Sequence, residues 1–285
     1  MQIEPFTVVI PAFNEEAGIQ PVIHELQQGL ADYDFKLIVV DDGSEDRTAE
    51  LAREAGATVL SQPVNRGYGA SLKTGIRQAS HDNIVIIDAD GTYPVAAIPS
   101  LVAGLAEYEM VVGARIGANV SIPLIRRPAK RVLQWLASYL AGRKIPDLNS
   151  GLRAMKRDLV LQYAFLLPSG FSFTTTITLA ALCRDHLVDY QKIDYRARVG
   201  KSKIRPHHAF DFLILILRTI VYFNPLKVFL PLGAVFVFTG LIKTIYDIWI
   251  GDLSESAIFA FLAGGLVWVV GLLSDQISRM GIHPD

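Results

Sequence analysis

Two stretches near the C-terminus are free of charge and constrain the fold more than any other feature. Val228–Ile242 is uncharged, and Ser256–Ser274 gives 19 residues without a charge. Both approach the roughly 20 residues that a helix needs to cross about 30 Å of hydrocarbon. We therefore predict a two-span transmembrane hairpin over residues 226–285. A helical hairpin buried in a soluble core is the alternative interpretation.

Charges around these stretches predict how the hairpin is oriented. The short loop between them is acidic, with Asp247, Asp252 and Glu255. Basic residues lie on the other side, and they are Lys201, Lys203, Arg205, Arg218, Lys227 and Arg279. The positive-inside rule places both ends of the hairpin in the cytoplasm. Cys183 is the single cysteine, which indicates a reducing compartment, and Met1–Pro5 lacks the basic region of a signal peptide. We expect a multi-pass protein of the cell membrane with a cytoplasmic N-terminal domain.

The segment before the hairpin is apolar but interrupted. Polar side chains of His207, Asp211, Arg218 and Tyr222 can line one stripe of a helix that includes Ala209–Phe223. Such a helix is suited to lie in the membrane interface, so we predict an interfacial amphipathic helix over residues 206–225. A third, poorly made span is the alternative.

Residues 6–113 alternate between short β-branched runs and segments with helical spacing. The predicted strands are Phe6–Pro11, Lys36–Val40, Ala57–Leu60, Asn83–Ile87 and Met110–Gly113. The predicted helices are Glu15–Asp32, Thr48–Ala55, Ala70–Ser80 and Val95–Tyr108. This alternation predicts an α/β domain with a parallel sheet, which we place at residues 1–205. Ligands of such sheets bind beyond the C-terminal ends of the strands.

Two acidic clusters fall at those strand ends. Asp41 and Asp42 follow the second predicted strand, and Asp88 and Asp90 follow the fourth. Carboxylates at this spacing can hold Mg²⁺ or Mn²⁺ together with a diphosphate, because these ions favour oxygen ligands and often bind substrate phosphates. We predict Asp88 and Asp90 as metal ligands. Solvated or helix-capping turns are the alternative for both clusters.

A basic stretch without acidic residues follows the fifth predicted strand. Residues 110–146 contain no Asp or Glu, and their basic residues are Arg115, Arg126, Arg127, Lys130, Arg131, Arg143 and Lys144. A basic amphipathic helix is typical of binding to a membrane surface, and the arginine fork can bind two phosphate oxygens at once. A solvated basic face is the alternative. The net charge of −1 gives no global basic field, so we expect no nucleic-acid partner.

Several motifs in order carry a family resemblance. They are Val8–Glu16, Val40–Ser44, Asn65–Ala70 and Asp88–Asp90. Together they resemble the family 2 glycosyltransferases, whose GT-A fold is a Rossmann-like, mostly parallel sheet. Val112–Arg115, Asp147–Arg153 and Arg198–Ile204 are similar to the dolichyl-phosphate mannose synthase branch, which includes bacterial polyprenyl-phosphate glycosyltransferases with two C-terminal spans. The resemblance covers about the first 205 residues of the chain.

The resemblance implies a role for each motif. The nucleotide-sugar donor would be bound by Pro11, Ala12, Asn14, Glu15, Asp41, Asp42, Gly67, Lys73, Asp88, Ala89, Asp90, Lys201 and Lys203, the last two on a loop that closes over it. The phosphate of the lipid acceptor would be bound by Arg115, Arg126, Arg127, Lys130, Arg131 and Arg198. Thr92 departs from relatives that carry a metal-contacting Gln there, and Thr174–Thr176 from relatives that carry a Glu. The first departure concerns the metal ligands, and the second concerns sugar or acceptor choice.

The expected reaction is inverting transfer of a sugar from a UDP- or GDP-sugar to a polyprenyl phosphate such as undecaprenyl or dolichyl phosphate. Because the second pKa of a phosphate monoester is near 6, that acceptor is largely dianionic at pH 7 and is already a nucleophile. The expected catalytic residues are Asp88, Asp90, Arg115 and Asp147. For Asp147 the roles left open are orienting an arginine, positioning the acceptor, acting as a base, and forming a turn.

Two other functions remain as alternatives at this stage. One is transfer to another lipid or glycan acceptor, and the other is a non-catalytic membrane protein that binds a sugar nucleotide. Small residues such as Gly264 and Gly265 in the predicted hairpin are compatible with a homo-oligomer.

Overall fold

The computed structural model describes residues 3–116, 134–139, 141–170, 172–196, 208–251 and 254–280, with the backbone alone for 208–213. The described strands are β1 (Phe6–Ala12), β2 (Phe35–Asp41), β3 (Thr58–Ser61), β4 (Asn83–Ile86), β5 (Met110–Ala114), β6 (Arg153–Lys156) and β7 (Val188–Lys192). These seven strands form one sheet in the order β3-β2-β1-β4-β6-β5-β7. Strand β6 is antiparallel to β4 and β5, and the other pairs are parallel.

The predicted strands and their direction are confirmed, whereas β6 and β7 were not foreseen. From β1 the chain builds outward through β2 and β3, and it then returns to place β4 on the other side of β1. The direction of strand addition therefore reverses between β1 and β4, which is where open α/β sheets bind ligands. Strand β1 is buried along its whole length, as expected for a central strand covered on both faces.

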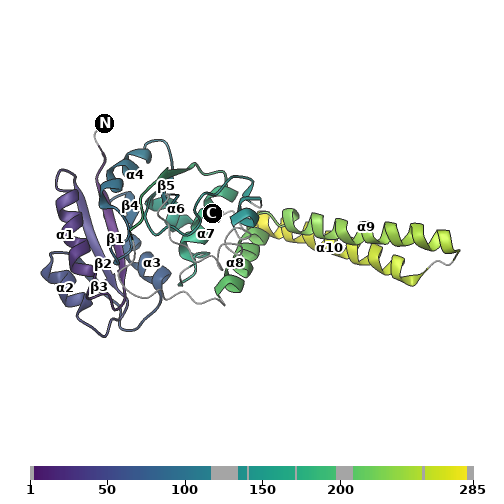
Figure 1. Ribbon diagram of the computed structural model, residues 1–285, viewed down its shortest axis with the longest axis horizontal. Helices are drawn as coiled ribbons and strands as arrows, with labels where there is room; N and C mark the ends of the chain where they lie inside the picture. The colour runs from purple at the N-terminus through teal and green to yellow at the C-terminus, as the bar shows by residue number, and fades with distance from the viewer. Residues whose placement is uncertain are drawn as a thin grey trace.

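Helices cover both faces of the sheet (Figure 1). One face carries α1 (Ile19–Gly29), α2 (Thr48–Glu54), the 3-10 turn η1 (Val95–Ala97) and α4 (Ile98–Gly104). The other face carries α3 (Tyr68–Gln78), α6 (Arg157–Gln162) and α7 (Phe173–Cys183). Each face has its own apolar core, because alternate residues of β1 point to opposite sides, Val8 and Ile10 to the first and Val9 to the second.

Helix α8 (His208–Phe223) lies against the α/β domain within the segment predicted to be interfacial. Its Ile216 and Ile220 are fully buried with Leu179 and Leu182 of α7 and with Ala137 of a short helix at residues 134–139. At 16 residues the helix is about 24 Å long, which is too short for a typical span. Among the described helices, two are long and apolar enough to cross a membrane, and α8 is not one of them.

Those two helices are α9 (Leu226–Ile250) and α10 (Glu255–Met280), which form a hairpin that projects away from the α/β domain (Figure 1). Only 11% and 17% of the residues in their most apolar windows are buried, so their apolar side chains do not form a soluble core. Glycines let the two helices approach each other: Gly233 faces Trp268, and Gly240 faces Phe261. This arrangement favours a membrane hairpin over the soluble alternative.

Candidate functional site

A cavity of about 390 Å³ opens at the C-terminal ends of β1 and β4, where the strand order reverses. Its lining comes from chain segments far apart in sequence: Pro11, Ala12, Phe13, Glu15, Asp42, Asn65, Gly67, Tyr68, Ser71, Asp88, Ala89, Asp90, Tyr93, Arg115, Asn149, Gly151, Thr174 and Tyr195. The cavity therefore joins residues expected to bind the donor with Arg115, which was expected to bind the acceptor phosphate.

Hydroxyl groups hold the carboxylates of Asp88 and Asp90, which line this cavity. The phenol of Tyr68 donates to Asp88 Oδ1 at 3.0 Å. The hydroxyl and backbone N–H of Thr92 donate to Asp90 Oδ1 at 2.6 and 3.2 Å. Thr92 is completely buried and is not among the residues that line the cavity. In this chain, therefore, residue 92 orients a carboxylate of the acidic pair.

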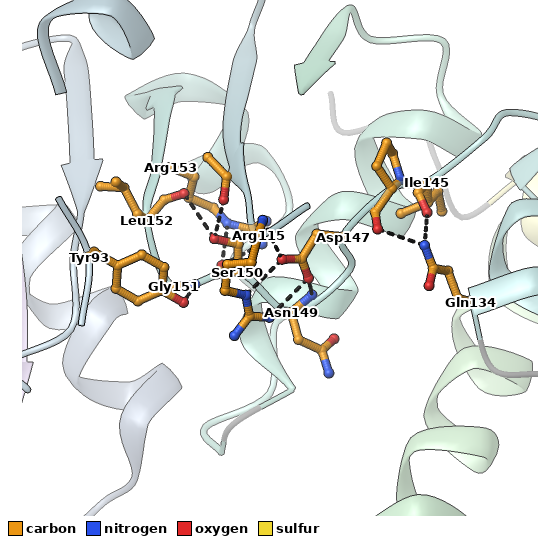
Figure 2. Close-up of polar contacts among 12 residues, drawn as sticks. Tyr93, Arg115, Gln134, Ile145, Asp147, Asn149, Ser150, Gly151, Leu152 and Arg153 are labelled. Carbon is orange, nitrogen blue, oxygen red and sulfur yellow. Dashed lines mark hydrogen bonds and ion pairs between the residues drawn. The ribbon is translucent and has the colours of Figure 1, made fainter. Parts of the chain in front are cut away.

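Tyr93 and Gly151 close the site around Asp88. The backbone N–H of Gly151 donates to the phenol oxygen of Tyr93 at 2.6 Å (Figure 2). A Cβ atom at position 151 would overlap the carboxylate of Asp88, so any larger residue there requires that carboxylate to move. Burial, followed by the nearby charge of Asp88, raises the pKa of both Tyr68 and Tyr93. Both phenols therefore keep their protons at neutral pH and remain hydrogen-bond donors.

The acidic pair fits one way of holding a divalent cation. Within the described residues, no cluster of three or more His, Cys, Asp or Glu side chains is present. Asp88 and Asp90 supply carboxylate oxygens, the ligand type that Mg²⁺ and Mn²⁺ favour. Enzymes that act on phosphate-containing substrates commonly bind Mg²⁺ through one or two carboxylates, and phosphate oxygens and water complete the coordination. The residues present match that kind of site, in which the substrate completes the set of ligands.

Arg115 and Asp147 form a bidentate ion pair beside the acidic pair (Figure 2). Arg115 donates from Nε to Asp147 Oδ2 at 2.7 Å, from Nη2 to Oδ1 at 2.9 Å, and from its backbone N–H to Oδ2 at 3.1 Å. Arg115 lines the cavity, whereas Asp147 is 2% exposed and does not. Of the roles left open for Asp147, this geometry favours the orientation of an arginine.

Aromatic rings hold the other side of the arginine. The Arg115 guanidinium lies 5.3 Å from the ring centre of Tyr195, which in turn packs edge-on against Tyr93. Burial alone lowers the pKa of Arg115, but the hydrogen bonds to Asp147 and the nearby Tyr93 more than offset it, so the net pKa is raised. Arg115 is thus a fixed, permanently charged group at the cavity wall.

Arg153 supports the loop that carries Asp147. Its guanidinium is completely buried and donates from Nε and Nη2 to the carbonyl of Ser150 at 3.1 and 2.8 Å. Its Nη1 donates to the carbonyl of Thr174 and the hydroxyl of Thr178. Burial lowers the pKa of Arg153. This side chain ties the 147–151 loop to the first turn of α7, and both of these segments contribute residues to the cavity.

A second cavity of about 460 Å³ adjoins the first, and both are lined by Phe13 and Asn65. Asp41 lines this second cavity, and its Oδ1 accepts a hydrogen bond from the Ser44 backbone. Asp42 lines the first cavity, where its two oxygens accept the backbone N–H groups of Arg66 and Gly67 at 2.9 and 2.8 Å. The two acidic residues at the end of β2 therefore shape two loops around adjoining cavities.

Two residues expected to bind the donor line neither cavity. Asn14, in the left-handed region with φ of 51°, joins the loops after β1 and β2 through its hydrogen bonds with Ser44 and Glu45. Lys73 on α3 points away from the cavity, because its ammonium group donates to the carbonyl of Leu167 at 2.8 Å.

The remaining expected residues lie outside the described parts of the chain. They are Arg126, Arg127, Lys130, Arg131, Arg198, Lys201 and Lys203. Conversely, the structure adds cavity residues that sequence reasoning missed, namely Phe13, Asn65, Tyr68, Ser71, Tyr93, Asn149, Gly151 and Tyr195, and it places Thr174 at the cavity as well. Several fall within recognised motifs, but Tyr93 and Tyr195 carry no local signal, because only folding brings them together.

Comparisons with known proteins agree with this geometry. Residues 7–163 match the model of glycosyl transferase family 2, and residues 224–280 match the GtrB C-terminal hairpin. The chain therefore belongs to glycosyltransferase family 2. It is 31% identical to a dolichyl-phosphate hexose transferase of Haloferax volcanii, over 71% of this chain and 88% of the relative. It is 27% identical to an undecaprenyl-phosphate 4-deoxy-4-formamido-L-arabinose transferase of Proteus mirabilis, over 98% and 90% of the two chains.

Among solved structures, the fold resembles glucosyl-3-phosphoglycerate synthase of Mycobacterium tuberculosis. In a complex of that enzyme with Mn²⁺, uridine diphosphate and phosphoglyceric acid, the TM-score is 0.62 at 25% identity. The match covers 76% of this chain and 78% of the other. A further structure of that enzyme holds Mg²⁺ and uridine diphosphate. The GT-A fold expected from the motifs is thereby confirmed.

Proposed function

We propose that this protein transfers a sugar from a nucleoside diphosphate sugar to a polyprenyl phosphate, with inversion at the anomeric carbon. The observation that carries the proposal is that one cavity is lined by the Asp88–Asp90 pair and by Arg115, which Asp147 holds from behind the cavity wall. One pair is suited to a diphosphate with its cation, and the other is suited to a second phosphate. The named activities of the Haloferax and Proteus relatives support the same assignment.

On the donor side, Asp88 and Asp90 would hold Mg²⁺ or Mn²⁺ against the diphosphate. The bound cation supplies neutralisation of the charge that develops on the departing nucleoside diphosphate. The Tyr68 and Thr92 hydroxyl groups keep both carboxylates in place before the substrate arrives. This preorganisation avoids reorientation during the reaction, which is the main source of electrostatic catalysis.

On the acceptor side, Arg115 would bind the lipid phosphate. Because that phosphate is largely dianionic at neutral pH, one of its oxygens attacks the anomeric carbon without a general base. A new bond forms between that oxygen and the sugar, and the bond from the sugar to the diphosphate breaks. The nucleoside diphosphate leaves with the electron pair. Asp147 and Tyr195 hold the arginine in the orientation that brings the two anions together.

The charges at the two ends of the hairpin support a cytoplasmic site. Exposed basic residues Arg218, Lys227 and Arg279 lie at the end next to the α/β domain. Asp247 and Glu255 lie at the opposite end. By the positive-inside rule, this distribution of charge favours the cytoplasmic face for the domain.

One experiment tests the proposed function. The purified protein in phospholipid vesicles is incubated with undecaprenyl or dolichyl phosphate and a panel of UDP- and GDP-sugars, with Mg²⁺, Mn²⁺ or a chelator. The expected product is a polyprenyl-phosphate monosaccharide identified by mass, formed only with a divalent cation. 3-Phosphoglycerate serves as a soluble phosphorylated acceptor in a parallel reaction. Transfer to 3-phosphoglycerate alone, or no transfer from any donor in the panel, would contradict the lipid-phosphate assignment.

A further inference from the structure

The short helix at residues 134–139 presents three different faces. Gln134 and Ser138, four residues apart, form a polar face, and Ala137 lies on a buried face. Trp135 and Tyr139, also four residues apart, form an exposed aromatic face. Residues four apart on a helix lie on the same side, so each face contacts a different environment.

The polar face clamps the segment that leads into Asp147. Gln134 Nε2 donates to the carbonyl oxygens of Ile145 and Pro146 at 2.7 and 2.6 Å (Figure 2). The hydroxyl of Ser138 accepts the backbone N–H of Ile145 at 3.1 Å. Three hydrogen bonds thus fix two consecutive residues to this helix.

The clamped segment is continuous with the arginine of the site. Pro146 is bonded directly to Asp147, whose two oxygens hold Arg115 (Figure 2). The planar peptide bond between the two residues passes a displacement of the Pro146 carbonyl directly on to the nitrogen of Asp147. A movement of the 134–139 helix is therefore transmitted through one short covalent segment to the guanidinium of Arg115.

The aromatic face lies at the base of the hairpin. The rings of Trp135 and Tyr139 are stacked, with centroids 5.8 Å apart and planes 12° apart, yet they are 66% and 53% exposed. Ala137 on the buried side of the same helix shares an apolar cluster with Ile216 and Ile220 of α8, and Val228 of α9 packs against that cluster. An aromatic pair beside the start of an apolar hairpin is suited to the bilayer interface, where Trp and Tyr are enriched. Arg143 and Lys144, exposed just after this helix, add charge that suits anionic headgroups.

We propose that Gln134 and Ser138 are positioning residues that couple the seating of Trp135 and Tyr139 on the bilayer surface to the placement of Arg115. The effect on the reaction rests on the proposed function, in which Arg115 binds the lipid phosphate. The contact of Trp135 and Tyr139 with the bilayer surface, called seating here, does not depend on that function. The bilayer surface is the chosen occupant, because the segment that carries the aromatic face lies beside the start of α9, where a Cβ at Gly142 would be 3.2 Å from Lys227 Nζ.

A fluorescence measurement tests the seating without any activity. The chain has three tryptophans, so Trp249→Phe with Trp268→Phe leaves Trp135 as the single emitter. This variant is reconstituted in vesicles that contain phospholipids brominated along their acyl chains. The expected result is strong quenching by bromine near the headgroups and weaker quenching by bromine deep in the chains. The triple variant with Trp135→Phe gives the blank. No quenching, or quenching only by a brominated polyprenyl phosphate, would overturn seating on the bilayer.

A second measurement tests the coupling. Ser138→Ala removes the hydroxyl that accepts the Ile145 N–H, and Ser138→Thr retains a hydroxyl as the matched control. Gln134→Ala removes the other two bonds. The alanine variants should raise the KM for polyprenyl phosphate and lower kcat by about 5- to 50-fold, with unchanged nucleotide affinity, while Ser138→Thr stays within about twofold of wild type. Wild-type kinetics in both alanine variants, or an equal loss of nucleotide affinity, would refute the coupling.

A third comparison links the two parts. Trp135→Ala with Tyr139→Ala should weaken transfer in vesicles but not transfer to a short-chain, water-soluble polyprenyl phosphate. Phe165→Ala is the control, since that ring is 72% exposed on another segment. Equal activity of the double variant and wild type in vesicles would contradict the inference. If the wild type transfers no sugar to any lipid phosphate, the proposed function fails, whereas the quenching result still decides the seating.

Discussion

Arg115 is held by Asp147 through three hydrogen bonds, yet only the arginine reaches the cavity. Asp147→Asn keeps the shape but replaces an oxygen acceptor with an amide that repels the guanidinium. We expect kcat/KM for the lipid phosphate to fall by about 100-fold, as when a preorganised charge contact is lost, while nucleotide binding stays intact. Glu50→Gln is the control, because the Arg47–Glu50 pair is exposed on both sides and such pairs contribute little. An active Asp147→Asn variant with normal lipid dependence would refute the positioning role.

The acidic pair gives a prediction about the cation. Asp88→Asn and Asp90→Asn each remove a carboxylate oxygen from the cavity floor. Both variants should lose transfer activity by at least about 100-fold at saturating Mn²⁺, because the charge on the leaving diphosphate is no longer neutralised. Binding of Mn²⁺ in the presence of nucleotide, measured by electron paramagnetic resonance, should weaken in parallel. Unchanged Mn²⁺ affinity in both variants would remove the pair from the metal site.

Replacing Gly151 by alanine should reduce activity while leaving the fold intact. A methyl group at this position would overlap the carboxylate of Asp88, so Gly151→Ala should displace that side chain and reduce transfer at least tenfold. Gly170→Ala is the matched control, since a Cβ there meets no atom within 4 Å. Activity and circular dichroism of both variants check the prediction. Full activity of Gly151→Ala would show that Asp88 has room to move without consequence.

Substitutions at two neighbouring glycines of α10, Gly264 and Gly265, should differ in their effect on stability. A Cβ at Gly264 would lie 2.7 Å from Val237 Cγ2 and 3.0 Å from the Gly233 carbonyl, whereas one at Gly265 meets nothing within 4 Å. Gly264→Val should therefore separate the two hairpin helices and lower the thermal stability of the detergent-solubilised protein. Gly265→Val should leave the stability unchanged. Gly264 thus packs within the hairpin, and the homo-oligomer stays a prediction. A change of oligomeric state in Gly265→Val alone would assign that residue to contact with a second copy.

Glu109 makes stability depend on pH. Burial alone raises the pKa of this carboxyl, but its hydrogen bonds to His186 and to the Leu187 backbone outweigh burial and lower the pKa below 4.5. A carboxyl with a lowered folded-state pKa adds stability above its unfolded pKa, and this stability is lost as the pH falls through the folded value. Glu109→Gln should therefore lower the melting temperature at pH 7 and make little difference near pH 3. An equal loss at both pH values would contradict this account.

The sequence was enough to place the acidic pairs and Arg115 at one edge of the sheet. Each follows a strand with a clear apolar pattern, and parallel strands end on the same side. Strand β6 was missed because it is four residues long and holds the buried Arg153, whose charge hides it in an apolar pattern. The contact of Lys73 with the Leu167 carbonyl could not be predicted, because the two residues are 94 positions apart. Tyr93 and Tyr195 could not be predicted, since their contact depends on the packing of separate loops.

The base of the hairpin is tied to the α/β domain at more than one point. Ser278 near the end of α10 donates to the carbonyl of Tyr222 in α8, and Val228 of α9 packs in the cluster that contains Ala137. With the hairpin inserted in a bilayer, as we propose, these contacts would keep the cavity at a constant height above the leaflet. The cavity would then meet its two substrates in different ways. The nucleotide-sugar arrives by diffusion through the aqueous solution, and the lipid phosphate arrives by lateral diffusion in the plane of the membrane. Saturation by the lipid should consequently follow its mole fraction in the membrane, so that adding inert phospholipid at fixed total acceptor slows the enzyme by surface dilution.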